Sequence, residues 1–251
     1  MSRPRVAFHD HFSAVAAAYA RARPTYPQAL FAWLAGIAPS TTQAWDAGCG
    51  SGQASRGLAA HFRQVYATDP SAGQVAQASA PANVTFAVEP GERCGLPDAS
   101  IDAACVAQAL HWFDRDAYYA ECDRVLKPRG VLVAWGYQDI EVPDALRDAV
   151  AAFAADIRPY WPAERALVDA AYAGFAWPFP AIEAPAMAIE ADWPLPRLLA
   201  YFSSYSATHR YREATGIDPV AQHAQAVATA WGNAAARRVR WPMFVHARRK
   251  P

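Results

Sequence analysis

The sequence lacks the features that mark nucleic-acid-binding and membrane-surface proteins. Its 251 residues carry 23 basic and 23 acidic side chains, so the formal net charge is zero and no basic excess is available for a phosphate backbone. The C-terminal run Arg248-Arg249-Lys250 is short and is interpreted as a solvated tail. We therefore expect no nucleic-acid partner and no binding to an anionic membrane.

Cysteine pairs and long apolar runs are also missing. The four cysteines, Cys49, Cys94, Cys105 and Cys122, form no CxxC pair and have no zinc-type spacing with histidine, so neither a disulfide framework nor a metal site is expected. The alanine-rich stretch 145–155 is interrupted by charges, whereas a membrane helix needs about 18 apolar residues or more. No signal-peptide core follows Met1. These absences predict a reduced, cytoplasmic protein.

The central part of the chain alternates short apolar strands with helices. The pattern predicts strands at 43–47, 64–68, 84–88, 101–107 and 131–135, with helices at 53–61, 71–79 and 114–125. This alternation is typical of an α/β protein with a doubly wound, mostly parallel sheet covered on both faces.

Predicted helices flank this central part on both sides. Before it, helical spacing and the proline-rich stretch 23–27 indicate two helices joined by an elbow. After Tyr137 the pattern predicts helices at 143–157, 163–173, 195–205 and 219–231, and strands at 186–190 and 238–245. Pro242 places the last strand at a sheet edge or a bulge.

Three glycines at alternate positions follow the first predicted strand, in the stretch WDAGCGSGQ. Gly48, Gly50 and Gly52 lie where a strand ends and a helix begins, so backbone amides there can meet a polar or anionic ligand, although a turn without a ligand is an alternative. The dinucleotide pattern fails at Gln53, and a phosphate loop would need a Gly-Lys-Ser/Thr ending. Asp46, just before the loop, suits an ammonium or hydroxyl group better than a pyrophosphate.

A second acidic residue, Asp69, ends the second predicted strand. A carboxylate at this place in a doubly wound sheet can accept both ribose hydroxyls of a nucleoside. The alternative is an N-cap ahead of Pro70-Ser71, because Asp is a favoured cap. Together, the glycine loop and Asp69 favour a nucleoside ligand.

These motifs and two later ones resemble those of a known family. Asp46 to Gly52, Asp69, LPDASID at 96–102 and RVLKPRG at 124–130 are similar, in type and in order, to the motifs of class I S-adenosylmethionine-dependent methyltransferases of methyltransferase type 11. The resemblance runs from about Tyr19 to Tyr137. The N-terminal stretch 19–27, QALHWF at 108–113 and the stretch 201–206 are further similar to the trans-aconitate methyltransferase-like branch.

The resemblance implies a Rossmann-like α/β fold with a seven-stranded, mostly parallel sheet. An N-terminal helical lid precedes the sheet, and a C-terminal helical insertion precedes the last, antiparallel strand. We accordingly expect one domain, with lid helices at 1–37, a cofactor-binding core at 38–138 and a helical substrate cap with the final strands at 139–251.

The resemblance also implies the contacts to S-adenosyl-L-methionine, whose product is S-adenosyl-L-homocysteine. By family position, Gly48, Gly50 and Gly52 would wrap the methionine part, Asp46 would lie near its amino group and Asp69 would bind the ribose. The other implied contacts are Pro70 and Ser71 beside the adenine, Gly91 and Glu92 over its edge, Gln108 beside the sulfonium, and Tyr19 and Arg23 in the lid. The stretch 89–97 departs from the family, because it has extra residues and lacks the frequent Asp before the adenine.

The sulfonium already activates its methyl group, so the protein must align the acceptor and exclude water. His111 follows the fourth predicted strand and is the candidate catalytic residue, able to take a proton or to bind an acidic substrate; a packing histidine is the alternative. The candidate substrate-binding residues, for which an aromatic core is the alternative, are Trp112, Tyr160, Trp161, Tyr205, His209 and Arg210. One specific hypothesis places a substrate carboxylate near His111, His209 and Arg210.

The sequence thus predicts methyl transfer to a small organic acceptor, most directly at a carboxylate or hydroxyl oxygen, by a monomer or homodimer. Two alternatives stay open at this point. One is a non-catalytic module that binds S-adenosylmethionine, and the other is a nucleotide-dependent oxidoreductase.

Overall fold

The computed structural model describes residues 23–251; Tyr19 and the first predicted helix lie outside the described residues. The elements in chain order are α2 (Gln28–Ile37), β1 (Gln43–Ala47), α3 (Gln53–Ala59), β2 (Gln64–Asp69), α4 (Ala72–Gln77), β3 (Val84–Val88), β4 (Ile101–Ala107), the 3-10 helix η1 (Leu110–Trp112), α5 (Arg115–Val125), β5 (Leu126–Tyr137), η2 (Asp144–Leu146), α6 (Arg147–Ile157), η3 (Arg158–Tyr160), α7 (Arg165–Asp169), β6 (Ala181–Ile182), β7 (Ala188–Trp193), α8 (Leu195–Ser203), α9 (Ser206–Thr215), α10 (Pro219–Trp231) and β8 (Arg237–Arg249).

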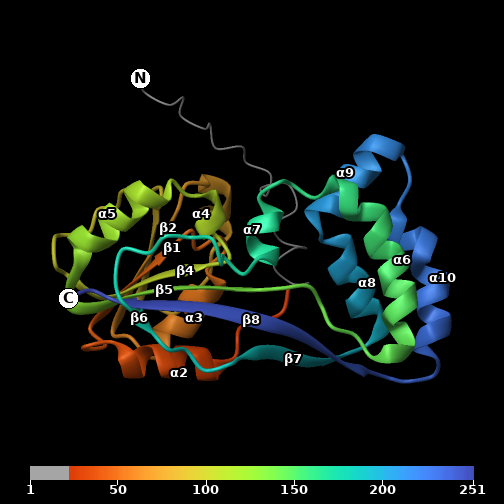
Figure 1. Cartoon of the computed structure of the whole chain (residues 1–251), viewed down its shortest axis with the longest axis horizontal. Helices are drawn as coiled ribbons and strands as arrows, with labels where there is room; N and C mark the ends of the chain where they lie inside the picture. The colour runs from red at the N-terminus through yellow and green to blue at the C-terminus, as the bar shows by residue number, and fades with distance from the viewer. Residues whose placement is uncertain (1–22) are drawn as a thin grey trace.

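The sheet confirms the predicted doubly wound α/β fold. Its strands follow the order β3-β2-β1-β4-β5-β8-β6, which supplies the expected seven strands, and β7 pairs with β8 outside this path. Strands β1 to β5 are mutually parallel, whereas β8 runs antiparallel to β5 and β6 (Figure 1). The order reverses between β1 and β4, and this is where ligands bind in open sheets of this kind.

Both faces of the sheet are buried at its centre, as β4 shows with buried residues from 101 to 106. In β4, Ala103 and Cys105 belong to one buried cluster, while Ala104 and Val106 belong to the other. The first cluster includes residues of α2 and α3, and the second includes residues of α5. This period of two places helices on both faces of a parallel sheet, as the sequence pattern predicted.

Helix α2 packs very closely on α3. A Cβ at Gly57 of α3 would lie 2.1 Å from the ring of Phe31, which is 1% exposed. Only glycine allows this approach, although it costs helix propensity in the middle of α3. The contact fixes α3, and with it the glycine loop that precedes this helix.

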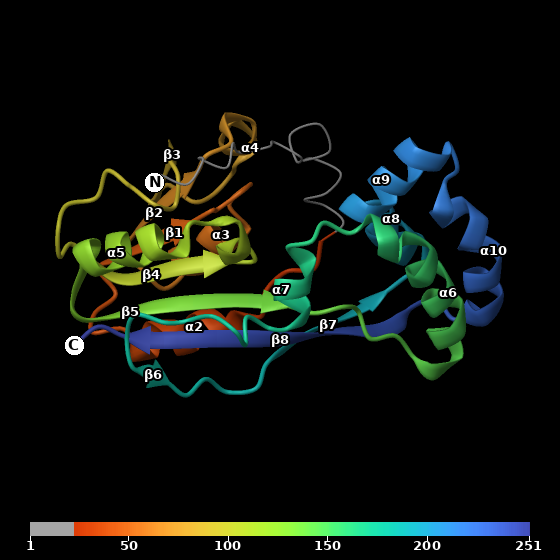
Figure 2. The ribbon, with the colours of Figure 1, turned by 45° about the horizontal axis from the view of Figure 1, so that its top comes forward.

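Strand β8 joins the core to the cap, which consists of α6, α8, α9 and α10 (Figure 2). Residues 243–249 pair with β5 and residues 237–242 pair with β7. The prediction of a sheet edge at Pro242 was wrong, since Gln138 N donates to its carbonyl and Ala188 is its partner on the other side. The proline lies instead where β8 changes partners, a position at which its missing N–H is tolerated.

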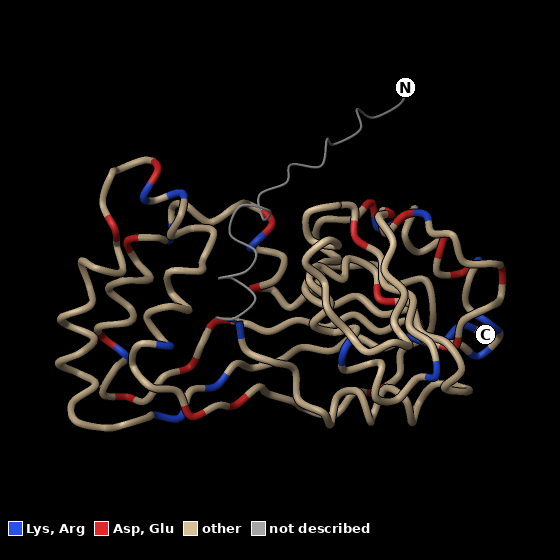
Figure 3. Tube along the Cα trace, turned by 180° about the vertical axis from the view of Figure 1, so that it is seen from behind, with Lys and Arg blue, Asp and Glu red and all other residues tan. Residues whose placement is uncertain are grey.

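The cap has its own helices but shares a buried cluster with the core. The cluster on the α2 and α3 face continues through Trp135 and Tyr137 to Phe153 of α6 and Trp241 of β8. The sequence pattern missed α9 and β6, and α7 is shorter than the predicted helix at 163–173. Basic and acidic residues are interspersed along both the core and the cap (Figure 3). No helix among residues 23–251 is long and apolar enough to cross a membrane.

Candidate active site

The glycine loop between β1 and α3 adopts a conformation that strongly favours glycine. Gly48, Gly50 and Gly52 all have left-handed backbone angles, with φ of +68°, +54° and +82°. A Cβ at Gly48 would lie 2.7 Å from Ala109 Cβ. A Cβ at Gly50 would meet only Gln74 Oε1, at 4.0 Å. The loop therefore leaves room above its middle residue.

Asp46 lies directly behind this loop as a buried carboxyl group that lacks one partner. Ser55 Oγ donates to Oδ2 at 2.5 Å, but Oδ1 has no hydrogen-bond partner within residues 23–251. Burial raises the pKa of Asp46 to about 7, opposed by the Ser55 hydrogen bond and assisted by the charge of Asp69. A ligand ammonium is the kind of donor that Oδ1 lacks, so the residues present fit the implied cofactor.

Asp69 accepts hydrogen bonds from two loops, the glycine loop after β1 and the loop between β2 and α4. Its Oδ2 accepts from Gly50 N at 2.9 Å, and its Oδ1 accepts from Ser71 N at 2.9 Å. The capping alternative does not hold for Asp69, because Ser71 is the N-cap of α4 and its Oγ accepts from Gln74 N. A carboxylate at the end of the second strand of a doubly wound sheet is the type of group that accepts from ribose hydroxyls.

The other residues implied beside the adenine lie around the same loops. Pro70 connects Asp69 to the cap of α4 and is half-buried. Glu92 Oε1 accepts from Asp114 N at 2.8 Å, and this bond ties the 89–97 loop to the start of α5. A Cβ at Gly91 would lie 2.6 Å from the ring of Phe113, which also lies 3.0 Å from a Cβ built on Gly48. Phe113 therefore joins the two glycine segments, a role that the sequence did not indicate.

Gln108 extends the pairing between β4 and β5. Its Oε1 accepts from Tyr137 N at 2.9 Å, and its Nε2 donates to Tyr137 O at 3.3 Å. Its φ is +53°, a sparsely populated angle for a residue with a side chain. A Cβ at Gly136 would lie 2.4 Å from Gln108 Oε1, so this glycine is needed for the arrangement. Such local strain is common where a site is held in place.

Arg23 connects the N-terminal segment with the end of β5. Its Nη1 donates to the Tyr137 hydroxyl at 2.7 Å. Its charge also acts on Tyr205 of the cap. Burial and the charge of Asp139 raise the pKa of Tyr205 above its usual value, and the charges of Arg23 and Arg165 partly offset this rise. The predicted lid residue thus lies at the junction of core and cap.

His111 lies in η1, the 3-10 helix that follows β4, and is held in its neutral form. Its Nδ1 lies 2.8 Å from the hydroxyl of Tyr172. Burial, with a smaller contribution from the positive charge of Arg165, lowers the pKa of His111 to about 4. Sequence reasoning missed both Tyr172 and Arg165, because neither is near His111 in the chain and neither belongs to a motif.

Arg165 and the aromatic cap residues form a second group at this junction. The Arg165 guanidinium lies 4.5 Å from the ring centroid of Trp161, and the Trp161 ring lies 5.2 Å from that of Tyr205. Arg165 also pairs with Asp139 and, at 2.6 Å, with Asp169. The structure therefore brings the predicted residues Trp161 and Tyr205 together around a cation that was not predicted.

The remaining predicted substrate residues are more dispersed. Tyr160 packs edge-on against Tyr211 of α9 at 5.1 Å, and Trp112 is 43% exposed beside the His111 ring. His209 Nε2 is buried without a partner in the described chain. No hydrogen bond or ring contact within residues 23–251 joins His111 to His209 or Arg210, so the hypothesis of one carboxylate near all three stays a prediction.

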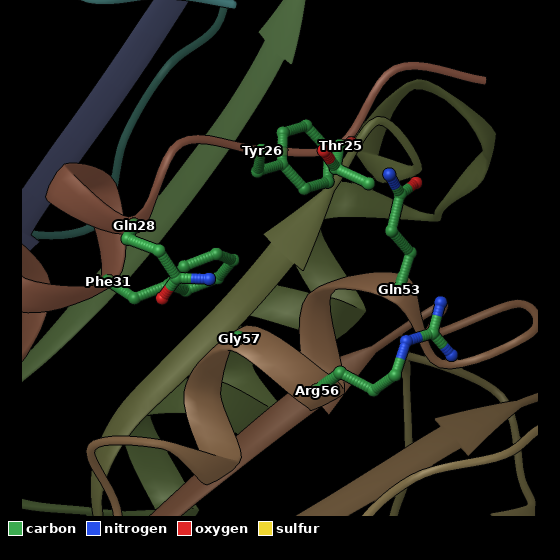
Figure 4. A pocket seen from close by; sticks show the side chains of 7 residues that line it. All are labelled: Thr25, Tyr26, Gln28, Phe31, Gln53, Arg56 and Gly57. Carbon is green, nitrogen blue, oxygen red and sulfur yellow. The ribbon is translucent and has the colours of Figure 1, made fainter.

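Two surface pockets lie beside the site without containing its polar centre. The first, of about 170 Å³, lies between α3 and the segment before α2, where Gln53 Nε2 donates to Pro24 O at 2.5 Å (Figure 4). It is smaller than the roughly 300 Å³ of a typical small-molecule site. The second, of about 500 Å³, is lined by Arg124, whose guanidinium already binds Glu121, Asp98 and two carbonyl groups. No cluster of metal-ligating side chains occurs in the described part of the chain.

Comparison with known proteins gives consistent matches. The model of a family described as "Methyltransferase domain" matches residues 45–134. A protein of Dictyostelium discoideum named as a methyltransferase is 30% identical over 205 residues, which are 79% of this chain and 78% of that protein. An uncharacterized methyltransferase of Mycobacterium tuberculosis is 34% identical over about half of each chain. A solved structure from Anaeromyxobacter dehalogenans, named as a type II methyltransferase, is 44% identical, covers 90% of this chain and 97% of that one, and has a TM-score of 0.86.

Proposed function

We propose that the protein methylates a small organic acceptor at an oxygen atom, with a carboxylate preferred over a hydroxyl group as the acceptor. The chain belongs to the methyltransferase type 11 family of class I S-adenosylmethionine-dependent enzymes. Family membership identifies S-adenosylmethionine as the methyl donor. It decides against the two alternatives, a nucleotide-dependent oxidoreductase and a non-catalytic binding module. The acceptor class is the part that is proposed.

The sheet side of the site is suited to hold the donor. When bound, S-adenosylmethionine supplies an electrophilic methyl group. Asp46 would accept from the ammonium with its partnerless Oδ1, and Asp69 would accept from the ribose while it still holds Gly50 N. The left-handed glycines allow close approach of the backbone.

The observation that carries the acceptor proposal is the neutral His111 with Arg165 nearby. A pKa of about 4 leaves His111 uncharged near neutral pH, so it is a poor proton acceptor but a good hydrogen-bonding group. Arg165 supplies a positive charge close to His111 and to the Trp161 ring. This combination suits an organic anion, whose oxygen needs no base to react.

The mixed surface charges are consistent with a small acceptor. Basic and acidic residues are interspersed along core and cap (Figure 3), and a formal net charge of zero gives no general attraction for nucleic acid. A monomer or a homodimer agrees equally well with this proposal. The narrower trans-aconitate-like branch stays a prediction.

A mass-spectrometric screen for methyl transfer tests the proposal. Small mono-, di- and tricarboxylic acids, phenols and amines are incubated with the protein and S-adenosylmethionine, and each product is identified by its added methyl mass. We expect methyl esters from one or more carboxylic acids. Methylation of amines alone, with carboxylic acids and phenols untouched, would contradict an oxygen acceptor.

A further inference from the structure

We propose that Tyr172 is a positioning residue that fixes His111 as the Nε2–H tautomer, so that His111 donates a hydrogen bond to an acceptor oxygen instead of acting as a general base. The inference rests on the proposed function and specifies what His111 does within it. The two residues meet because the turn after α7 packs against the end of β4.

The chemistry of the two partners decides which atom donates. Tyr172 Oη and His111 Nδ1 are 2.8 Å apart. A phenol is a stronger acid than a neutral imidazole N–H, and an imidazole nitrogen is a much stronger base than a phenol oxygen. The favoured bond therefore has the Tyr172 hydroxyl donating to Nδ1.

This bond leaves the single ring proton on Nε2. Burial and the charge of Arg165 hold the pKa of His111 well below neutrality, so the ring carries one proton only. Nε2 has no hydrogen-bond partner within residues 23–251. It is also not one of the fully buried, unpartnered polar atoms of the described chain, so it remains accessible. It is therefore available as a donor and is not able to take a proton from the acceptor.

Tyr172 is held too firmly to be a chance neighbour. Ala171 and Tyr172 both have left-handed backbone angles, with φ of +49° and +57°, although neither is glycine. Such angles persist only where the surroundings impose them, and they gather at functional sites. The Tyr172 ring stacks on Phe175 at 4.6 Å and is 1% exposed.

A second histidine fixes this turn from the sheet. His246 of β8 donates from Nε2 to Ala171 O at 2.7 Å. Tyr172 N also donates to Leu167 O at 3.0 Å, which anchors the turn on α7. Bonds from β8 and α7 thus place the Tyr172 hydroxyl, and that hydroxyl in turn orients His111.

Long-range ¹H–¹⁵N NMR on histidine-labelled full-length protein tests the tautomer directly. His111 signals are assigned by their loss in His111→Gln. We expect wild-type His111 to show a protonated Nε2 and an unprotonated Nδ1 at neutral pH. Observation of the Nδ1–H tautomer in the wild type would overturn the proposal.

Tyr172→Phe removes only the hydroxyl and supplies the kinetic test. We expect mixed tautomers for His111 and a kcat about tenfold lower, because one hydrogen bond is lost, with an unchanged Kd for S-adenosylhomocysteine. Tyr119→Phe is the matched control, since Tyr119 is 8% exposed in the same cluster and its hydroxyl has no partner in the described chain. Equal losses in both variants, or no change in Tyr172→Phe, would assign the effect to packing and reject the positioning role.

The two proposals fail separately in these experiments. The tautomer is read without an acceptor, so an Nε2–H result together with no oxygen methylation in the screen would reject the proposed function alone. Oxygen methylation with an Nδ1–H tautomer would reject the role of Tyr172 alone.

Discussion

The two sides of the candidate active site are built in different ways. On the sheet side, polar groups are held by backbone geometry, as in the pairing of Asp69 with Gly50 N and of Gln108 with the Tyr137 backbone. On the cap side, the Arg165 guanidinium lies against the Trp161 ring, which in turn contacts the Tyr205 ring, and these contacts are between side chains. Backbone-held groups suit one fixed cofactor, whereas side-chain surfaces are easily changed to fit different acceptors.

Removal of Asp69 breaks the sheet side and gives the largest expected effect. Asp69→Ala loses the acceptor for Gly50 N and the acceptor that we propose for the ribose. Two charge-assisted hydrogen bonds at about 1.5 kcal/mol each correspond to roughly 100-fold weaker binding of S-adenosylhomocysteine, measured by calorimetry. The control is Asp98→Ala, whose carboxylate is 79% exposed and pairs with Arg124. Comparable losses in both variants would remove Asp69 from the binding site.

A change at Gly57 tests whether the packing of α2 on α3 supports the sheet side. Gly57→Ala forces a Cβ to within 2.1 Å of the Phe31 ring, so we expect a loss of about 1–3 kcal/mol in unfolding free energy, measured with urea. Gly36→Ala is the matched change in a helix, with no atom within 4 Å, and is expected to stabilise by up to about 1 kcal/mol. Equal behaviour of the two variants would show that this contact does not constrain the fold.

Truncation of Trp161 breaks the cap side and leaves the sheet side intact. Trp161→Ala removes the ring between Arg165 and Tyr205. We expect kcat/KM for the acceptor found in the screen to fall about tenfold, because the loss of a cation–π contact and of packing costs on the order of 1–2 kcal/mol, while the Kd of S-adenosylhomocysteine stays constant. Trp33→Ala on α2, a half-buried tryptophan, is the control. A weaker affinity of Trp161→Ala for S-adenosylhomocysteine would contradict the proposed division into a cofactor side and an acceptor side.

The smallest expected effect is a pH dependence of cofactor binding. The pKa of Asp46 is raised to about 7 in the ligand-free protein, and an ammonium beside it favours the ionised form, so binding releases a proton. Affinity for S-adenosylhomocysteine should therefore rise by up to about tenfold from pH 6 to 8. Calorimetry in buffers of different ionisation enthalpy measures the proton release. Asp46→Asn should abolish both effects, and their persistence in this variant would place the titration elsewhere.

Some of the motifs that carried the family resemblance hold the fold together. In RVLKPRG, Lys127 pairs with the buried Asp102 at 2.8 Å, and Asp102 also accepts from Thr42 N and Gln43 N. Arg124 of the same motif donates to the carbonyls of Cys94 and Leu96. The order of these motifs identified the family because the fold requires such braces at fixed places between strands.

The residues that sequence reasoning missed share a physical cause. Phe113 lies between Gly48 and Gly91 because of how two loops approach each other. Tyr172 and Arg165 reach His111 only because the segment after β5 returns to the end of β4. Contacts between segments distant in the chain leave no periodic signal in the sequence.

By itself, the sequence determined the sheet, the glycine loop and the two acidic residues beside it, because strand period, left-handed turns and strand-end carboxylates are local requirements. Tertiary structure alone decided the partners of these groups. It paired β8 with both core and cap and set the hydroxyl of Tyr172 against His111. It also left one oxygen of Asp46 without a hydrogen-bond partner among residues 23–251. Burial and charge at these junctions depend on the packing of several elements at once, and no single segment encodes them.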